Sequence, residues 1–448
     1  MKLNRVLAGV VSSKPDLKVE TDWVTADSRK VKPGSVFVAY KGVEVDGHDF
    51  VGQAVDNGAA AVVGEKDPSL SVPYFKVKNG RLAWAQMTAS LFDNPEKKLT
   101  FVGVTGTDGK TTTTNLIYQM LLAAGIKVAM VSTIKAVIGE KEYDTGLHTS
   151  SPDPDVLWKW LSEIVAAGQT HVVLETTSHG LAQYRFGDIQ FEVGVLTNVA
   201  SDHLEFHGTR KKYLAAKARL FERSRVSVLN RRSWGLEFLK KKAKGRVVGY
   251  QGRDYIEENF LAASKAAKIL GISQEAIAQG AKNLGQLPGR FERVKNSRGL
   301  NLIVDFAHTE QGLGAVLGRV GRMRRRGEKI IVVFGCNGER DRTKRVPMGR
   351  AACRLADLVV VTVEDPRKEP IGQIYGQIEE GCLAAGGVLG QTFFREDDRE
   401  KAIDFAINKL ARKGDWVLFL GKGHEKSMNI AGVETAWNEV SIVKEKLK

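Results

Sequence analysis

Short apolar runs alternate with longer stretches of helical pattern along most of the chain. The first runs cover residues 35–40, 59–63, 100–105 and 128–132, and each is short enough for a buried strand. Later runs cover 171–175, 193–197, 302–306, 329–334, 358–362 and 415–420. Because parallel strands need a crossover between them, usually a helix, this alternation predicts an α/β fold with mainly parallel sheets.

Two turn signals divide this pattern into three parts. Asp93-Asn94-Pro95 ends the first group of strands, and Leu287-Pro288-Gly289 separates the second group from the third. We therefore predict an N-terminal domain over 1–97, a central domain over 98–287 and a C-terminal domain over 288–448. The third domain repeats a doubly wound, Rossmann-like pattern.

Composition agrees with several globular domains. A chain of 448 residues suits roughly two to four domains, and its 43% hydrophobic and 27% charged residues exclude a mostly disordered chain. No apolar run approaches the roughly 18–20 residues that span a bilayer, and the first residues do not resemble a secretory signal. Three cysteines are too few for a disulfide framework. We therefore expect a cytoplasmic protein without a membrane partner.

The chain carries a net charge of +15, from 67 Lys and Arg against 52 Asp and Glu. Such an excess suits nucleic acid, an anionic membrane surface or small anionic substrates. The basic clusters are short: Arg210-Lys211-Lys212, Arg231-Arg232, Lys240-Lys241-Lys242 and Arg324-Arg325-Arg326. Because they lack the interleaved aromatic residues of single-strand binding, we interpret them as solvated surface and expect no nucleic acid partner.

The strongest chemical signal is a glycine-rich loop between a predicted strand and a predicted helix. The segment 101–112 reads FVGVTGTDGKTT. Glycines let backbone N–H groups turn toward phosphate oxygens, and the following helix contributes its positive end. Lys110 would reach the outer phosphates, and the Thr111 hydroxyl would bind Mg²⁺. The loop predicts ATP binding by Gly106, Thr107, Asp108, Gly109, Lys110, Thr111 and Thr112.

Acidic and imidazole side chains follow two further predicted strands. Glu175 closes the run 171–175, and the segment 202–207 reads DHLEFH after the run 193–197. The carboxyl ends of parallel strands meet at one edge of a sheet, where an ATPase holds Mg²⁺ or orients a nucleophile. Six of the eight histidines fall in or beside such motifs, which favours a chemical role for them.

The form Gly-x-Thr-Gly-Thr-x-Gly-Lys-Thr resembles the ATP loop of the Mur ligases and of their folylpolyglutamate synthase relatives. Further motifs agree in order with Mur ligases that add the third residue of the peptidoglycan stem peptide. They are 27–29 with 34–42, 150–152, 175–185, 197–208 with 213–221, 289–294, 305–309, 335–349, 364–367 and 421–425.

This resemblance implies an activity and its cofactors. It implies an ATP-dependent amide-bond ligase that adds a diamino acid, meso-diaminopimelate or L-lysine, to UDP-N-acetylmuramoyl-L-Ala-D-Glu through an acyl phosphate. It also implies a central phosphate-loop domain with a parallel sheet and one or two Mg²⁺ ions. We expect the protein to act as a monomer.

The resemblance also assigns roles to matching residues. The expected catalytic residues are Lys110, Glu175, His203 and Lys217. The expected Mg²⁺ ligands are Thr111, Glu175, His203 and Lys217, the last in carbamoylated form. Further ATP contacts are expected from Asn259, Arg290, Asp305 and His308. UDP-sugar contacts are expected from Ser28, Ser150, Ser151, Thr177, Gln183 and Arg185. Amino-acid contacts are expected from Arg340, Glu364, Asp365, Pro366, Arg367, Gly421 and Glu425.

Several positions depart from the family pattern. Asp365 stands where members that take meso-diaminopimelate usually have asparagine, and a carboxylate there favours a distal ammonium, as in L-lysine. Arg367 is kept and favours a distal carboxylate, so we expect meso-diaminopimelate on that ground. The central domain also lacks a segment that typical members have between Tyr250 and Asn259, so we regard it as trimmed after residue 230.

Three alternatives stay open at the level of sequence. A folylpolyglutamate-type ligase would share the loop but should lack the motifs at 27–29 and 364–367. A nucleic-acid-associated P-loop ATPase would use the net charge and predicts ATP hydrolysis stimulated by polynucleotide. A catalytically silent binding homologue would fit the trimmed domain and predicts ligand binding without phosphate release.

Overall fold

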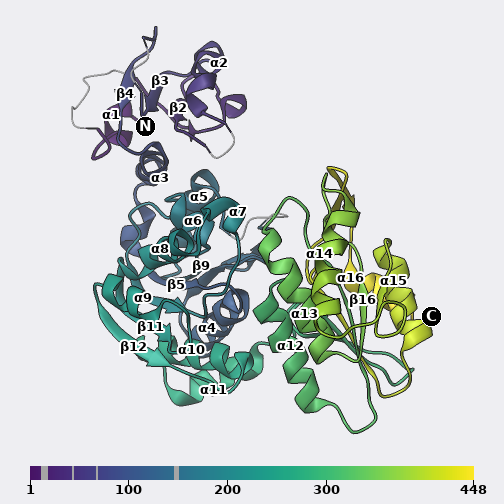
Figure 1. The fold of residues 1–448 in the computed structure, drawn as a ribbon. Helices are drawn as coiled ribbons and strands as arrows, with labels where there is room; N and C mark the ends of the chain where they lie inside the picture. Colours follow the sequence, from purple (N-terminus) through teal and green to yellow (C-terminus); the bar gives the residue numbers. More distant parts are fainter. Residues whose placement is uncertain (12–18, 43–44, 67–68, 146–150) are drawn as a thin grey trace.

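The computed structural model describes residues 1–11, 19–42, 45–66, 69–145 and 151–448. Three α/β domains, each built on one larger sheet, follow one another along the chain, from the purple N-terminal part to the yellow C-terminal part in Figure 1. This arrangement confirms the predicted three-domain α/β fold. Among the described residues, no helix combines the length and the apolar character that crossing a bilayer requires.

The N-terminal sheet has four parallel strands in the order β1-β2-β3-β4. They are β1 (Val24–Thr25), β2 (Val36–Ala39), β3 (Ala61–Gly64) and β4 (Tyr74–Lys76). Helices α1 (Leu3–Val6) and α3 (Gly80–Leu91) share an apolar core with one face of the sheet, and α2 (Val51–Asp56) packs on the other. The Gln86 amide of α3 donates to Asp188 at 2.6 Å, which links this domain to the central one.

The central sheet has eight strands in the order β12-β11-β10-β5-β9-β6-β7-β8. They are β5 (Thr100–Thr105), β6 (Val128–Val131), β7 (Ala136–Ile138), β8 (Lys141–Tyr143), β9 (His171–Glu175), β10 (Phe191–Leu196), β11 (Ser224–Asn230) and β12 (Arg246–Tyr250). The strands from β12 to β6 are parallel, as predicted for β5, β6, β9 and β10, whereas β11 and β12 were not predicted as strands. The last two strands, β7 and β8, add an antiparallel hairpin that the sequence pattern did not predict.

The order of the central strands locates the binding edge of the sheet. The chain passes from β5 to β6, returns to β9, and then crosses to β10 on the far side of β5. Ligands of open parallel sheets bind at such a switch point, outside the carboxyl ends of the strands. The loop that follows β5 lies at this point.

Helices cover both faces of the central sheet. On one face, α4 (Lys110–Ala123), α10 (Tyr255–Ile269) and α11 (Gln274–Asn283) share a core with β5 and β10. On the other, α5 (Pro154–Ala166), α8 (Arg210–Phe221) and α9 (Leu236–Lys242) form the second core. Two short helices, α6 (Ser178–Ala182) and α7 (Leu204–His207), follow the ends of β9 and β10.

The C-terminal sheet has six strands in the order β13-β14-β18-β15-β16-β17, and only β13 runs antiparallel. They are β13 (Glu292–Val294), β14 (Asn301–Asp305), β15 (Ile330–Phe334), β16 (Leu358–Val361), β17 (Phe393–Arg395) and β18 (Trp416–Leu420). A separate hairpin pairs β19 (Ser427–Ile430) with β20 (Val433–Ala436).

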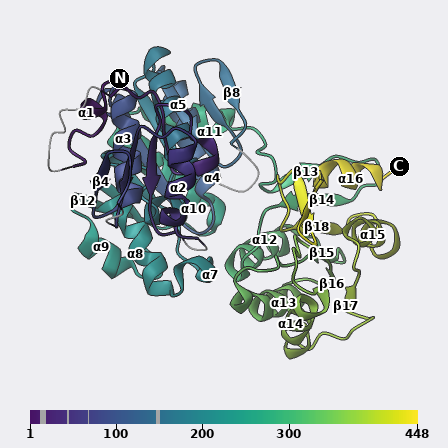
Figure 2. The same ribbon diagram turned by 90° about the horizontal axis from the view of Figure 1, so that it is seen from above.

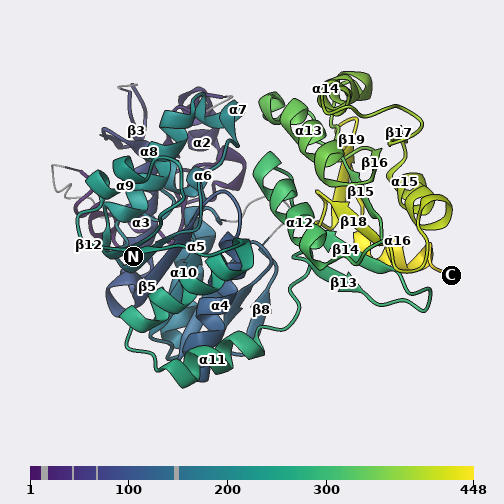
Figure 3. The same cartoon turned by 60° about the horizontal axis from the view of Figure 1, so that its bottom comes forward.

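Helices also cover both faces of the C-terminal sheet, which confirms the doubly wound prediction. One core takes α12 (Glu310–Met323), α13 (Arg345–Leu355) and α14 (Ile371–Ala384), and the other takes α15 (Arg399–Phe405) and α16 (Glu439–Glu445). Figures 2 and 3 show this domain beside the central one, with α12 on the facing side.

Candidate active site

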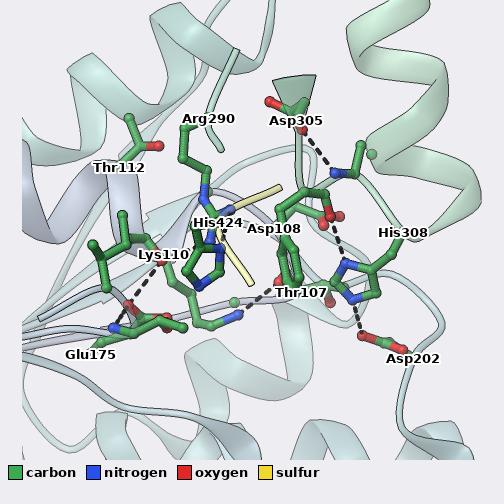
Figure 4. Close-up of a pocket in the computed structure, with 18 of the residues that line it drawn as sticks. Thr107, Asp108, Lys110, Thr112, Glu175, Asp202, Arg290, Asp305, His308 and His424 are labelled. Carbon is green, nitrogen blue, oxygen red and sulfur yellow. Dashed lines mark hydrogen bonds and ion pairs between the residues drawn. The ribbon is translucent and has the colours of Figure 1, made fainter. Parts of the chain in front are cut away.

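A cavity of about 770 Å³ lies between the central and C-terminal domains. Every residue that the sequence assigned to ATP lines it, and Figure 4 shows several of them converging from both domains. Glu175 and His203 line it as well, whereas Lys217 lies behind its wall. The fold therefore brings the predicted ATP residues together at the switch point.

The phosphate loop needs glycine at two positions for steric reasons. Gly106 and Gly109 have φ angles of +156° and +82°. A Cβ on Gly106 would collide with the Thr197 hydroxyl, and one on Gly109 would collide with the Asn259 amide. Only glycine therefore allows these two neighbours to pack against the loop.

The first turn of α4 offers its backbone donors to the cavity. Gly109 caps this helix without a side-chain acceptor, and within the part of the chain that the structure describes no side chain accepts from the N–H groups of Lys110, Thr111 or Thr112. The Lys110 ammonium donates to the Thr107 carbonyl oxygen at 2.8 Å, within the same loop. A helix N-terminus with free N–H groups and a lysine beside it is a site for phosphate.

Glu175 is held rigidly at the carboxyl end of β9. Its side chain is buried, and its Oε2 accepts from the Thr111 hydroxyl and the Thr133 N–H, both at 3.0 Å. Its Oε1 accepts from the Thr133 hydroxyl at 2.7 Å. Among the described residues, no group of three or more His, Cys, Asp and Glu side chains could hold a metal ion by itself. Magnesium usually takes one or two carboxylates plus substrate phosphates, and Glu175 with the Thr111 hydroxyl fits that donor set.

A buried ionic network joins the two domains beside the loop. Asp202, after β10, lies 3.6 Å from the Lys344 ammonium and 3.5 Å from His308 Nε2, both on the C-terminal domain. Burial alone would raise the pKa of Asp202, but Lys344 and His203 hold it well below its usual value. The pKa of His308 is raised despite its burial and the Lys344 charge, because Asp202 accepts from it.

The sequence assigned no role to Asp202 or Lys344, although both lie within motifs that it singled out. In the sequence, neither Asp202 nor Lys344 can be told from an ordinary charged residue of the surface. The pairing across the cavity becomes visible only in the folded chain, where both side chains are buried.

Lys217 on α8 is a buried amine in contact with the phosphate loop. Its Nζ donates to the Gly106 carbonyl oxygen at 2.6 Å and lies 4.3 Å from the centre of the Tyr213 ring. Burial, and then the charge of Lys110, hold the pKa of Lys217 well below its usual value. The lowered pKa favours the neutral form of this amine, which is the nucleophilic one.

Arg290 enters the cavity from the start of the C-terminal domain. Its guanidinium donates to the Thr111 hydroxyl at 3.4 Å and lies 3.3 Å from His424 Nδ1. Burial and Arg290 lower the pKa of His424 to about 2, so this imidazole stays neutral and accepts from the arginine. Asp305 is engaged by the backbone N–H groups of Phe291 and Ala307 at 2.6 and 2.8 Å, so it orders this turn.

Two arginines of the C-terminal domain face the cavity, and the nearby Asp365 carboxylate is paired with a lysine. Arg340 and Arg367 both line the cavity, and burial together with Arg367 lowers the pKa of Arg340. Asp365 Oδ1 instead accepts from the buried Lys422 ammonium at 2.8 Å and from the Asn429 N–H at 2.9 Å. The sequence argument treated Asp365 as a free carboxylate, but in the fold it is paired with the Lys422 ammonium, which it shares with Glu425.

The other predicted amino-acid residues surround this pair. Glu425 lines the cavity and accepts from Lys422 at 2.6 Å. Glu364 is buried, and its burial raises its pKa to about 7. A Cβ on Gly421 would collide with the Glu364 carboxylate, so glycine is required there. Pro366 belongs to the same turn and does not line the cavity.

Three of the predicted UDP-sugar residues form one cluster at the cavity. The Ser151 and Thr177 hydroxyls lie 2.9 Å apart, and Arg185 donates to the Ser151 carbonyl oxygen. Gln183 accepts from Arg185 at 2.9 Å behind them. Ser28 lies apart, in the N-terminal domain, where its hydroxyl donates to Gln53 at 2.7 Å. Ser150 lies outside the described residues.

A phosphate loop at the switch point, a carboxylate beside it and a second α/β domain over the cavity together define a P-loop enzyme that uses a nucleoside triphosphate. Family models match almost the whole chain: the Mur ligase family catalytic domain at 20–95, the Mur ligase middle domain at 104–279 and the Mur ligase glutamate ligase domain at 289–423. The chain belongs to the Mur ligase family and is a ligase.

Relatives with curated names agree over most of the chain. It is 36% identical to the UDP-N-acetylmuramoyl-L-alanyl-D-glutamate--2,6-diaminopimelate ligase of Geobacillus thermodenitrificans, over 89% of both chains. It is 34% identical to the UDP-N-acetylmuramyl-tripeptide synthetase of Roseiflexus sp., over 98% of this chain and 97% of the relative.

Solved structures show the same architecture. A UDP-N-acetylmuramoyl-L-alanyl-D-glutamate--2,6-diaminopimelate ligase covers 100% of this chain and 98% of its own, with 27% identity and a TM-score of 0.65. The MurF ligase of Thermotoga maritima in complex with ADP covers 97% of this chain and 98% of its own, with a TM-score of 0.59. At 22% identity, that second likeness concerns the fold alone.

Proposed function

We propose that this ligase joins meso-diaminopimelate to UDP-N-acetylmuramoyl-L-Ala-D-Glu in peptidoglycan precursor synthesis. The observation that carries the proposal is one cavity with two chemically different walls. Lys110 and Glu175 lie on the wall of the central domain, and Arg340 and Arg367 lie on the wall of the C-terminal domain. Relatives named 2,6-diaminopimelate ligases, at 34 to 36% identity, support the same substrate.

The reaction takes place in two steps. The γ-phosphoryl group moves from ATP to the D-Glu carboxylate, so that a P–O bond to ADP breaks and an acyl phosphate forms. The amino group of the incoming amino acid then attacks the acyl carbon, the amide bond forms, and phosphate and a proton leave. Activation is needed because a carboxylate is a poor electrophile at neutral pH.

The chain's own residues align the reactants and place positive charge where negative charge develops. Lys110, the N-terminus of α4 and Arg290 hold the phosphates. Glu175 and the Thr111 hydroxyl would hold Mg²⁺, which would neutralise phosphate charge. His203 would bind a second Mg²⁺, and Asp202 and Lys344 fix the C-terminal domain beside the loop. Arg340 and Arg367 bind the distal carboxylate of the amino acid.

Lys217 serves as a carbamate in this proposal. Its neutral amine attacks CO₂, a C–N bond forms, and the nitrogen loses a proton. The product is an anion where the unmodified chain has an amine, and it can bind a second Mg²⁺. The buried, low-pKa amine beside the Gly106 carbonyl supports this modification.

The remaining parts of the proposal concern the sugar and the setting of the enzyme. Ser28 of the N-terminal domain and the cluster at Ser151, Thr177, Gln183 and Arg185 would bind the UDP-sugar. Both catalytic walls come from one chain, which supports activity as a monomer. ATP and a UDP-sugar are cytoplasmic substrates, so we propose that compartment. We also propose that the central domain, compared with typical members of the family, is shortened after residue 230.

The test is phosphate release with ATP, Mg²⁺, the UDP-muramoyl dipeptide and either meso-diaminopimelate or L-lysine, with the product identified by mass. We expect release that needs all substrates and favours meso-diaminopimelate by at least about tenfold, or about 1.4 kcal/mol. Lys110→Ala should abolish it, and Lys265→Ala, an exposed change on α10, should not. Binding of ligands without release would identify a silent homologue, and a tenfold preference for L-lysine would overturn the substrate assignment.

A further inference from the structure

Three of the four basic clusters of the sequence converge on one outer face of the central domain. Arg210-Lys211-Lys212 opens α8, Arg231-Arg232 follows β11, and Lys240-Lys241-Lys242 closes α9. Helices α8 and α9 pack together, and the Arg210 guanidinium lies 4.4 Å from the centre of the Trp234 ring. We call this surface, made of the exposed residues of 210–212 and 231–247, the α9 face.

The α9 face concentrates much of the protein's charge. The ranges of the α9 face, 210–212 and 231–247, hold ten Lys and Arg residues and one Glu residue, whereas the whole chain has a net charge of +15. The side chains of Arg232, Lys240 and Lys242 are 53%, 45% and 48% exposed, although each lies near a glutamate. Clusters of about four to eight Lys and Arg residues are typical of segments that bind anionic lipids.

Large apolar side chains stand among these charges. Trp234, Phe238 and Val247 are 40%, 38% and 37% exposed. Val247 pairs with Ser227 of β11, and Ser227 lies on the same face of the sheet as Leu229, two residues further along that strand. Leu229 belongs to the core that α8 and α9 cover. Val247 therefore points to the same side of the sheet as α9. Partly exposed aromatic residues beside basic side chains, as Trp234 is beside Arg210 and Phe238 beside Lys242, suit the boundary between lipid headgroups and acyl chains.

The position of the α9 face leaves the active site open. Figures 1 and 3 show α9 and β12 on the side of the central domain that is turned away from the C-terminal domain. The cavity between those domains has no lining residue from this face. An occupant of the α9 face would therefore not block the entry of substrates.

We propose that the α9 face docks the enzyme on an anionic lipid surface. Charge complementarity selects an anionic occupant, and the exposed Phe238 and Val247 select one with an apolar interior. A single-stranded nucleic acid fits less well, because the Arg210 guanidinium already covers the Trp234 ring that a base would need for stacking. The sequence argument for solvated surface was wrong on one point, because Trp234 and Phe238 do stand between Arg231-Arg232 and Lys240-Lys241-Lys242.

The test is co-sedimentation of the full-length enzyme with vesicles of phosphatidylcholine alone or with about 40% phosphatidylglycerol. We expect binding to the anionic vesicles at about 0.05 M NaCl and at least about tenfold weaker binding at 0.5 M, because salt screens the lysines. Lys240→Gln/Lys241→Gln/Lys242→Gln should weaken binding at least about tenfold, and Phe238→Ala should weaken it independently.

The control is Arg324→Gln/Arg325→Gln/Arg326→Gln, which removes the same charge from the C-terminal domain and should bind like the unchanged enzyme. Phosphate release without vesicles should stay unchanged in every variant, which shows that each is folded. The proposal is overturned if the enzyme ignores anionic vesicles, if the control loses as much binding as the lysine variant, or if poly(U) displaces bound enzyme from the vesicles.

Discussion

Asp365→Asn tests which groups choose the amino acid. In the structure Lys422 contacts Asp365 at 2.8 Å, and the two side chains are 0% and 2% exposed. Two unit charges of the same sign about 4 Å apart repel by about 4 kcal/mol at an effective dielectric constant of about 20, roughly a thousandfold in kcat/KM. An unpaired Asp365 would therefore exclude a distal carboxylate, but the Lys422 ammonium already cancels most of this repulsion.

We therefore expect Asp365→Asn to change the kcat/KM ratio of meso-diaminopimelate over L-lysine by less than about threefold, or about 0.7 kcal/mol. Arg367→Ala, which removes a guanidinium from the cavity, should lower that ratio by at least about tenfold. The assay is initial phosphate release at saturating ATP and UDP-muramoyl dipeptide, with each amino acid varied in turn. A rise above tenfold in Asp365→Asn would refute the view that Lys422 neutralises Asp365.

Four further outcomes are expected. Lys422→Met should destabilise the C-terminal domain by about 3–5 kcal/mol in denaturant unfolding, because it leaves Asp365 and Glu425 without the cation that they share, and adding Asp365→Asn should recover part of the loss. Lys217→Ala should lower turnover at least about hundredfold and lose the mass of one bound CO₂. Lys344→Met should lower kcat at least about tenfold, and Lys344→Arg should lower it less, since Asp202 then keeps a cation; equal rates would contradict that role. The pKa of Glu364 is raised from 4.5 to about 7, so the stability gained from its protonated form is complete below pH 4.5 and lost as the pH rises through 7. Glu364→Gln should flatten the unfolding midpoint over that window.

The sequence predicted the sheets best where strands are buried on both faces. β5, β9 and β10 coincide with continuous apolar runs, because helices cover both of their sides. The hairpin of β7 and β8 was missed, since its strands have only three residues each and β8 reads Lys-Glu-Tyr. β7 is buried, but three residues make too short an apolar run, and the exposed β8 shows neither an apolar run nor an alternating pattern.

The candidate site was predictable where one local motif carries the chemistry. The loop at 106–112 and Glu175 are examples, since strand ends and glycines fix their positions. Residues whose role depends on a distant partner were misread or missed. The sequence argument treated Asp365 as a free acid, whereas in the structure Lys422 contacts it. The sequence argument gave Lys344 no role, and the structure shows that it pairs with Asp202.

One hydroxyl group connects the phosphate loop to the neighbouring domain. The Thr309 hydroxyl accepts from the Gly312 N–H at 2.9 Å, which caps α12, and donates to Asp108 at 3.1 Å. When the two domains separate, Asp108 loses this donor, and α12 loses its tether to the loop. Through this one hydroxyl group, the geometry of the phosphate loop depends on the position of the C-terminal domain.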